Sequence, residues 1–254
     1  MDPGASAGAT AHPLGGWRTP KVSQKVAMAI VEDLITRDLQ AGERLPPETE
    51  MMDRYKVSRA SLREGLRLLE TYGVITIRQG QRGGPEISAQ DPGDLARTLS
   101  LFFRLSAATY GDVFNARLLI EPVMSRIAAE QQNPELIKSL KAQIELEKTT
   151  PEDEYVHASN NFHQLVSGLS GNPVLDILGH ALRAFYAERL FRGQAVPDET
   201  LTHCRTAHPQ IGEAILTGNG PLAQALMTKH MTDLNRIVDQ RATWFMNERV
   251  TWEI

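Results

Sequence analysis

The chain has 254 residues, a length that accommodates one large domain or two small ones, and its composition is that of a soluble globular protein. Its single cysteine, Cys204, excludes an internal disulfide and a cysteine-rich zinc module. No apolar run reaches the roughly 18 residues that a membrane span requires. Residues 1–16 are rich in Gly, Ala and Pro and lack the apolar core of a signal peptide, so we expect a cytoplasmic protein.

Charge is distributed unevenly along the chain. The formal net charge is −4, yet residues 54–82 contain seven Lys or Arg and only two acids. From residue 91 onward, 15 basic residues stand against 20 acidic ones. A short basic segment in an otherwise acidic chain is typical of a phosphate-binding surface, but also of a solvated helix face. The pattern of the residues therefore has to distinguish the two.

The first predicted element is an amphipathic helix. Apolar residues recur at every fourth position, at Val22, Val26, Ile30 and Leu34. This spacing predicts a helix over residues 21–40, with Gly42 as its C-cap. Residues 1–17 before it lack apolar periodicity, and we expect them to form a disordered arm.

Two more helices are predicted before residue 72. A short one covers residues 48–55, after a turn that Pro46 and Pro47 stiffen. Ser58 is a good N-cap for the next helix, which ends near Thr71. One face of this helix is apolar, and another carries arginines at four-residue spacing, namely Arg59, Arg63 and Arg67.

These helices and the segment after them fit a helix-turn-helix with a β-hairpin wing. The start of a recognition helix enters the major groove and needs short donors and arginine, which the segment from Ser58 supplies. Residues 74–78 alternate like a strand, and residues 86–88 return as a second strand after a Gly-rich loop. The glycines let the backbone approach DNA, and Arg82 is expected to reach a phosphate or the minor groove. No helix and no Gly-Lys-Ser/Thr follow the loop, which disfavours a nucleotide-binding loop.

Three runs of this segment resemble the GntR family of bacterial regulators. They are Gly42-Glu-Arg-Leu-Pro-Pro-Glu, Val57-Ser-Arg-Ala-Ser-Leu-Arg-Glu-Gly-Leu-Arg-Leu-Leu-Glu and Gly73-Val-Ile-Thr-Ile-Arg-Gln-Gly. The resemblance implies a winged helix-turn-helix DNA-binding domain over residues 18–88. The DNA contacts expected from it are Arg44, Ser58, Arg59, Ser61 and Arg63 and, at the wing, Gln79, Gly80 and Arg82. Many relatives carry Arg where this chain has Thr49, so an operator preference does not transfer.

From residue 94 onward the sequence predicts helices only. Helical stripes run over residues 95–103 and 113–124, and further helices are predicted over residues 136–146, 162–169, 173–191, 209–216 and 221–244. Short Gly/Asn-containing loops separate them, which favours an antiparallel bundle. The predicted fold class is therefore mainly α: a winged helix-turn-helix of three helices and a hairpin, followed by an all-α antiparallel bundle over residues 92–247.

This C-terminal half is similar to the FCD-type ligand-binding domain of the FadR subgroup of the GntR family. The similarity is carried by Phe162-His163, Ser170-Gly-Asn-Pro, Ala214-Ile-Leu-Thr-Gly and His230. It implies a divalent metal, zinc or nickel, held by His163, His208 and His230. It also implies an organic acid effector that the metal binds together with Arg117, with Asn172 nearby. Neutral imidazoles suit such metals, and Arg is a bidentate partner for a carboxylate.

Two features of the sequence weaken this metal set. Metal-binding relatives carry Asp four residues before the first histidine, and this chain has Ser159 there. Pro209 directly follows His208 and is expected to start or kink a helix and so to move that imidazole. Three histidines alone can hold zinc. A metal-bound bundle and a metal-free bundle, in which the histidines bond to one another, to Ser159 and to water, both stay open.

The remaining candidates have simpler interpretations. Arg117 is spaced for a helix-face ion pair with Glu121, four residues later, as an alternative to effector binding. His157 and His203 match no position of the metal set, and we expect them at the surface.

The predicted function is that of a ligand-responsive transcriptional regulator. We expect a homodimeric repressor that an effector in the bundle releases from double-stranded operator DNA. The effector is either a small carboxylate, bound through metal and Arg117, or an acyl-CoA in an apolar, metal-free bundle. The alternative class is a metal hydrolase built on the histidine cluster. That enzyme lacks a nucleophile–base pair, and its nearest candidate base is Glu213.

Overall fold

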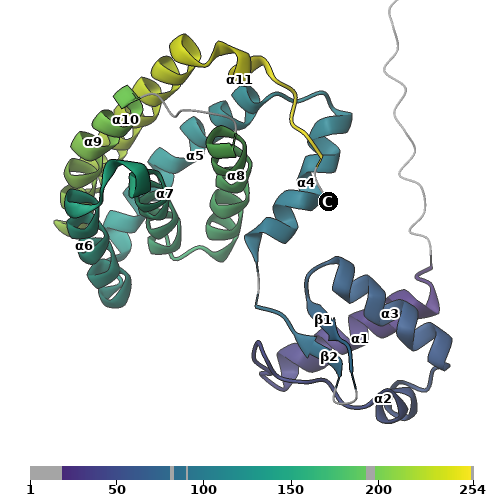
Figure 1. Cartoon of the computed structure of the whole chain (residues 1–254). Helices are drawn as coiled ribbons and strands as arrows, with labels where there is room; N and C mark the ends of the chain where they lie inside the picture. Colours follow the sequence, from purple (N-terminus) through teal and green to yellow (C-terminus); the bar gives the residue numbers. More distant parts are fainter. Residues whose placement is uncertain (1–18, 81–82, 90, 193–197, 253–254) are drawn as a thin grey trace, which may run out of the picture. The chain divides into compact units, whose positions relative to one another are not determined.

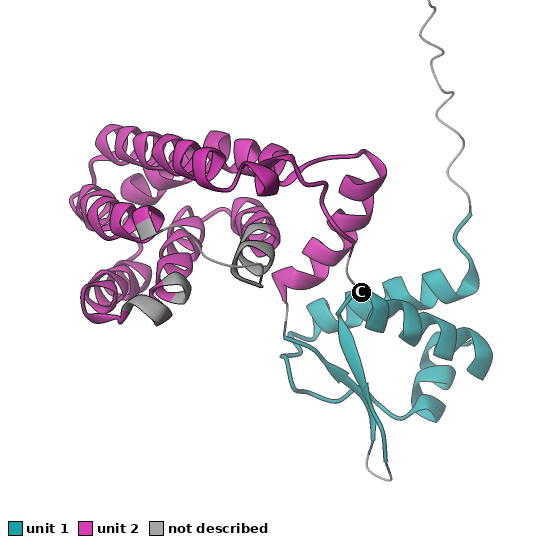
Figure 2. Ribbon diagram, turned by 45° about the horizontal axis from the view of Figure 1, so that its top comes forward, with its two compact units in different colours: residues 1–90 teal, residues 91–254 magenta. Residues whose placement is uncertain are grey.

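The computed structural model describes residues 19–80, 83–89, 91–192 and 198–252, and it divides into two compact units, residues 1–90 and 91–254 (Figures 1 and 2). Each unit has its own hydrophobic core. The predicted arm over residues 1–17 and the wing residue Arg82 lie outside the described residues.

Over residues 19–80 and 83–89, the first unit has three helices and a two-stranded sheet (Figure 1). Its elements are α1 (Val22–Thr36), α2 (Glu48–Tyr55), α3 (Arg59–Thr71), β1 (Ile75–Arg78) and β2 (Gly84–Ile87). The strands pair antiparallel, with Ile75 opposite Ile87, and both of these side chains are buried against the helices. This is the winged helix-turn-helix that the sequence predicts.

The first helix ends at Thr36, earlier than predicted. Asp38 adopts a left-handed conformation (φ 52°), and the N–H of Leu39 returns to the carbonyl of Leu34 at 3.0 Å. Gly42 is therefore not the C-cap of α1. It lies in the following turn at φ 87°, where its N–H donates to the carbonyl of Ile87 at 2.8 Å.

Helices α1 and α3 pack unusually close together at Gly65. A Cβ atom at this position would lie 2.4 Å from Cγ1 of Val26 and 2.9 Å from the carbonyl oxygen of Ser23. Only glycine fits between the helices without displacing the backbone. This contact fixes the position of α3, the predicted recognition helix, against α1.

The described residues of the second unit form helices and no strand. The helices are α4 (Pro92–Leu105), α5 (Tyr110–Gln131), α6 (Pro134–Thr149), α7 (Glu152–Leu169), α8 (Pro173–Arg192), α9 (Asp198–Leu216), α10 (Gly220–Arg241) and α11 (Thr243–Asn247). Helix α5 packs against α7, α8, α9, α10 and α11 and is the central helix of the bundle. The core continues past residue 247, because Val250 is fully buried and its N–H bonds the carbonyl of Ala108 at 2.9 Å.

Helix α9 corrects one prediction about the bundle. The sequence predicts a helix over residues 209–216, but this helix begins at Asp198, so Pro209 lies inside it and does not start it. Leu201, Cys204 and His208 share one buried face of this helix. Their burial stabilises the turns before the proline and offsets the backbone hydrogen bond that proline cannot make.

The C-terminal end of the bundle corrects a second prediction. Helix α10 ends at Arg241, and the chain turns at Ala242 before the short helix α11, so the continuous helix predicted to residue 244 is broken. Among the described residues, no helix is both long and apolar enough to cross a membrane.

Candidate functional site

The start of α3 presents the predicted DNA-binding side chains of the first unit. Ser58 caps the helix, since its Oγ accepts the N–H of Ser61 at 3.3 Å, and the two hydroxyls lie 3.1 Å apart. Arg59 and Arg63 follow on the same helix with exposed side chains. Short hydroxyl donors and arginines at an exposed helix N-terminus match the needs of major-groove recognition.

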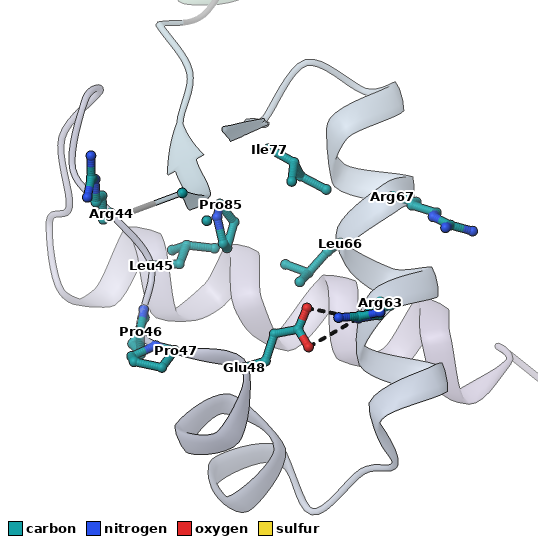
Figure 3. A pocket seen from close by; sticks show the side chains of 12 residues that line it. Arg44, Leu45, Pro46, Pro47, Glu48, Arg63, Leu66, Arg67, Ile77 and Pro85 are labelled. Carbon is teal, nitrogen blue, oxygen red and sulfur yellow. Dashed lines mark hydrogen bonds and ion pairs between the residues drawn. The ribbon is translucent and has the colours of Figure 1, made fainter. Parts of the chain in front are cut away.

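The two arginines share one carboxylate from the preceding helix. Glu48 on α2 accepts from Nε of Arg63 at 2.9 and 3.1 Å (Figure 3). Its Oε2 also lies 3.9 Å from Nε of Arg59. The sequence pattern gave no role to Glu48. Its position holds Arg63 in one orientation at the start of the recognition helix.

A groove separates α3 from the hairpin. Arg63, Leu66 and Arg67 line one wall, and Arg44 lies on the other beside Pro85 (Figure 3). The backbone of Arg44 is held there, because Arg44 forms a β-bridge with Glu86 and the N–H of Leu45 donates to Pro85 at 2.9 Å.

The predicted wing residues Gln79 and Gly80 follow β1 and are exposed, with Gly80 at φ 108°. Gly80 has open space where a Cβ would be. Arg82 is not described. Seven of the eight predicted DNA-binding residues are thus described: four lie at the start of α3, two directly follow β1, and Arg44 is bridged to β2.

The second unit brings the three predicted histidines together in its interior. His163 on α7, His208 on α9 and His230 on α10 are all buried, and their candidate ligand atoms lie within 4.8 Å of one another. Nε2 of His230 lies 3.3 Å from Nε2 of His208 and 3.3 Å from Nε2 of His163. Helices α7, α9 and α10 therefore each point an Nε2 atom at the same place.

The opposite ring nitrogen of each histidine has a partner of its own. Nδ1 of His163 lies 2.6 Å from Oε2 of Glu121, and Nδ1 of His208 lies 2.8 Å from Oε2 of Glu147. Nδ1 of His230 lies 3.1 Å from Nε2 of His203. Ionised carboxylates only accept hydrogen bonds, so Nδ1 of His163 and of His208 carry the protons and their Nε2 atoms present lone pairs.

This arrangement fits a metal ion. One proton on Nε2 of His230 would leave two lone pairs competing for it, whereas a cation between the rings satisfies all three. Zinc–imidazole bonds of about 2.0–2.1 Å at tetrahedral angles separate two nitrogens by roughly 3.3–3.4 Å. The two measured Nε2–Nε2 distances of 3.3 Å match this value. A carboxylate behind a ligating imidazole is also the usual support of such ligands.

Glu121 connects the histidines to Arg117. Its Oε1 accepts from Nε of Arg117 at 2.6 Å, and both side chains are buried. Burial alone would raise the pKa of Glu121, but the charges and hydrogen bonds of Arg117 and His163 outweigh burial and lower it to about 2. The ion pair that the sequence offered as an alternative role of Arg117 is therefore present, and it lies directly behind a candidate metal ligand.

Glu147 plays the same part behind His208. Burial opposes its ionisation, but hydrogen bonding to His208, Gln143 and Tyr155 lowers its pKa overall. The contacts are Gln143 Nε2 at 3.1 Å and the Tyr155 hydroxyl at 2.9 Å. The sequence did not reveal Glu147, because no spacing pattern marks a Glu and a Tyr on neighbouring helices as partners.

The remaining predicted residues are placed differently. Ser159 is buried and hydrogen-bonded to Cys204. Asn172 is exposed and caps α8, since its Oδ1 accepts from the N–H of Val174 at 3.0 Å. His203, expected at the surface, is half-buried and stacks on His230 with ring centroids 5.0 Å apart. The side chain of His157 lies outside the described residues.

The two units thus carry a winged helix-turn-helix and a buried cluster of three histidines, an arrangement typical of a one-component DNA-binding regulator. The model of the gntR family of bacterial regulatory proteins matches residues 22–83, and the FCD domain model matches residues 112–233. The chain belongs to the GntR family, and the FCD match is that of its FadR-like subgroup.

Individual relatives agree with this assignment. The chain is 31% identical over 167 residues to the uncharacterized HTH-type transcriptional regulator YcbG of Bacillus subtilis, covering 66% of this chain and 70% of the relative. It is 24% identical to the HTH-type transcriptional repressor NanR of Citrobacter rodentium, covering 88% and 85%. The solved structure of Streptococcus agalactiae GntR has the same fold, with a TM-score of 0.67, 22% identity and coverage of 84% and 99%. The matched gntR model describes bacterial regulatory proteins, and these two curated relatives are named as transcriptional regulators, so the hydrolase alternative has no support.

Proposed function

We propose that the chain is a metal-dependent repressor that binds operator DNA as a homodimer and is released by a small carboxylate. The observation that carries the proposal is the convergence of three imidazole Nε2 atoms, two of them 3.3 Å from the third, with every Nδ1 held by a further side chain. His163, His208 and His230 would hold the metal. When bound, the metal supplies a Lewis-acid position for a carboxylate oxygen.

The residues around the histidine cluster orient the imidazoles and supply a buried positive charge that an anion can bind. Glu121 and Glu147 fix the tautomers of His163 and His208, and His203 supports His230. Arg117 places a buried positive charge next to Glu121, where a carboxylate can share it. Ser159 contributes no anionic ligand, which leaves one more position for an oxygen of the effector.

The acyl-CoA alternative fits the interior less well. An acyl chain needs an apolar cavity, whereas the middle of this bundle holds three histidines, two glutamates and Arg117. These polar and charged side chains offer an acyl chain no apolar contacts, and burying them beside it would cost their remaining hydration without new hydrogen bonds. The polar cluster therefore favours a small carboxylate.

Regulation then requires two states of the dimer. Two recognition helices reach successive major grooves only at one half-site spacing. An effector that binds more tightly to a state with another spacing shifts the population toward it and releases the DNA. The names of the NanR relatives, which are repressors, support this direction of control.

The test starts by selecting bound duplexes from a random-sequence library with the metal-loaded, full-length protein. Fluorescence anisotropy then measures release of the selected duplex by carboxylates and by acyl-CoAs, for the wild type and for His163→Ala. We expect carboxylates to release DNA from the wild type, while the variant binds DNA and no longer responds. Release by acyl-CoA alone, unchanged by chelation or by the variant, would overturn the proposal.

A further inference from the structure

Arg183 on α8 lies at the level of the histidine cluster. Helix α8 contacts its neighbours one turn earlier, where a Cβ on Gly179 would lie 2.5 Å from Oγ of Ser167 on α7 and 3.3 Å from Cε of Met124 on α5. Helices α7 and α8 are consecutive and run antiparallel, so one turn forward on α8 corresponds to one turn back on α7. That turn of α7 holds His163, whose carbonyl accepts from Oγ of Ser167 at 3.0 Å.

The guanidinium of Arg183 is only partly paired there. Its Nη2 donates to Oε1 of Gln164, the residue next to His163, at 2.8 Å. Its Nε is buried and has no hydrogen-bond partner among the described residues. A buried, unmatched N–H on a charged group costs free energy, which a ligand oxygen would recover.

The charges near Arg183 also favour an anion beside it. Burial lowers its pKa, and repulsion by Arg117 lowers it further, while the Glu121 carboxylate acts in the opposite sense. Glu121 is already engaged by Arg117 and His163 at 2.6 Å each. Arg117 and Arg183 are thus both attracted by Glu121, whose two oxygens already bond Arg117 and His163.

Among the described residues, three arginines lie near the two carboxylates behind the histidines. Arg117 pairs with Glu121, Arg183 is attracted by the same carboxylate, and Arg205 donates to the backbone carbonyl of Glu147 at 2.7 Å. A divalent cation among the histidines would add two positive charges that these carboxylates do not offset. An anion with two negative charges compensates them, and a monocarboxylate leaves one buried charge unpaired.

We propose that Arg183 is a second anchor of the effector site, so that the effector carries two anionic groups, one for the metal and Arg117 and one for Nε of Arg183. This inference rests on the proposed carboxylate sensor and narrows its ligand to a dicarboxylate or a compound of equivalent charge. Arginine suits this role because its planar fork binds an oxyanion with fixed geometry.

The test is calorimetric titration of the metal-loaded, full-length protein with matched acids of equal chain length. The pairs are butyrate with succinate, pentanoate with glutarate, and hexanoate with adipate. The variants are Arg183→Gln, Arg183→Lys and the control Arg126→Gln, whose exposed side chain pairs with Glu130 on the outer face of α5. We expect at least one dicarboxylate to bind the wild type about tenfold or more tightly than its monocarboxylate partner.

The variants separate an anchoring role from a structural one. Arg183→Gln should weaken the dicarboxylate about tenfold and the monocarboxylate less than about threefold, Arg183→Lys should keep part of the preference, and Arg126→Gln all of it. If Arg183→Gln does not fold, as judged by its thermal melt, Arg183→Lys carries the comparison. Equal binding of both members of every pair, or an equal loss for both in the variants, would overturn the inference while the carboxylate sensor stands. Binding of no carboxylate at all would instead overturn the proposed function.

Discussion

Nδ1 of His208 donates a hydrogen bond to the Glu147 carboxylate at 2.8 Å, which ties α9 to α6 behind the histidine cluster. Both groups are buried, and the contact fixes which ring nitrogen of His208 faces His230. The same relationship recurs between His163 and Glu121. The interior of the bundle is therefore organised around three imidazoles whose orientation the surrounding side chains determine.

Replacing Glu147 by Gln should weaken metal binding. The amide is a poorer acceptor for Nδ1 of His208 and no longer fixes its tautomer, and losses of about 10- to 100-fold are typical when such a partner is removed. Titration of zinc or nickel into the metal-free, full-length protein measures the affinity. Glu145→Gln is the matched control, because Glu145 lies on the same helix with an exposed side chain that pairs with Lys148. Equal affinities for the two variants would contradict a supporting role of Glu147.

His203 should support His230 in the same way. His203→Phe keeps the ring stacked on His230 but removes the nitrogen that lies 3.1 Å from Nδ1. We expect the variant to fold normally and to bind metal more weakly, by about tenfold or more. An unchanged metal affinity with an unchanged thermal melt would show that the stacking alone matters.

Glu48 should restrain the arginines of the recognition helix. Glu48→Gln removes a carboxylate that holds Arg63 and competes with DNA phosphates, so binding to non-specific duplex should tighten and depend more steeply on salt. Glu50→Gln, also on α2 and exposed, is the control for the change in net charge. Anisotropy titrations at several salt concentrations measure both quantities. The same shift in both variants would mean that the contact with Arg63 is irrelevant.

The close approach of α1 and α3 predicts a stability effect at Gly65. Alanine there meets Val26 and the Ser23 carbonyl, and the overpacking should cost about 1–3 kcal/mol of unfolding free energy. Gly168→Ala makes the same chemical change in α7, where the added Cβ meets only Oδ1 of Asp176, at 3.7 Å. Chemical denaturation monitored by circular dichroism should show a loss for the first variant and little change for the second. Similar midpoints for both would contradict the close packing.

The first unit was largely predictable from the sequence. Local patterns were sufficient to predict α2, α3 and the hairpin. These patterns are the helix periodicity, the Ser58 cap and the alternation before Gly80. The end of α1 was not predicted, because the left-handed residue that closes it is Asp38 and not a glycine.

The all-helical fold of the second unit could be predicted from the sequence, but the start of α9 and the partners of the histidines could not. The early start of α9 depends on burying Leu201, Cys204 and His208 against other helices, which a local pattern with Pro209 in it does not reveal. The three histidines were found through family resemblance. Their partners Glu147 and His203, and the nearby Arg183, are brought there by tertiary packing alone and were missed.

Metal binding by the histidine cluster is tested most directly by elemental analysis of the purified, tag-free protein with plasma mass spectrometry. We expect about one zinc, nickel or manganese ion per chain, lost in a His163→Ala/His230→Ala variant that remains folded. Wild-type protein that contains no metal, takes up none from solution and still binds DNA would contradict metal binding by the cluster.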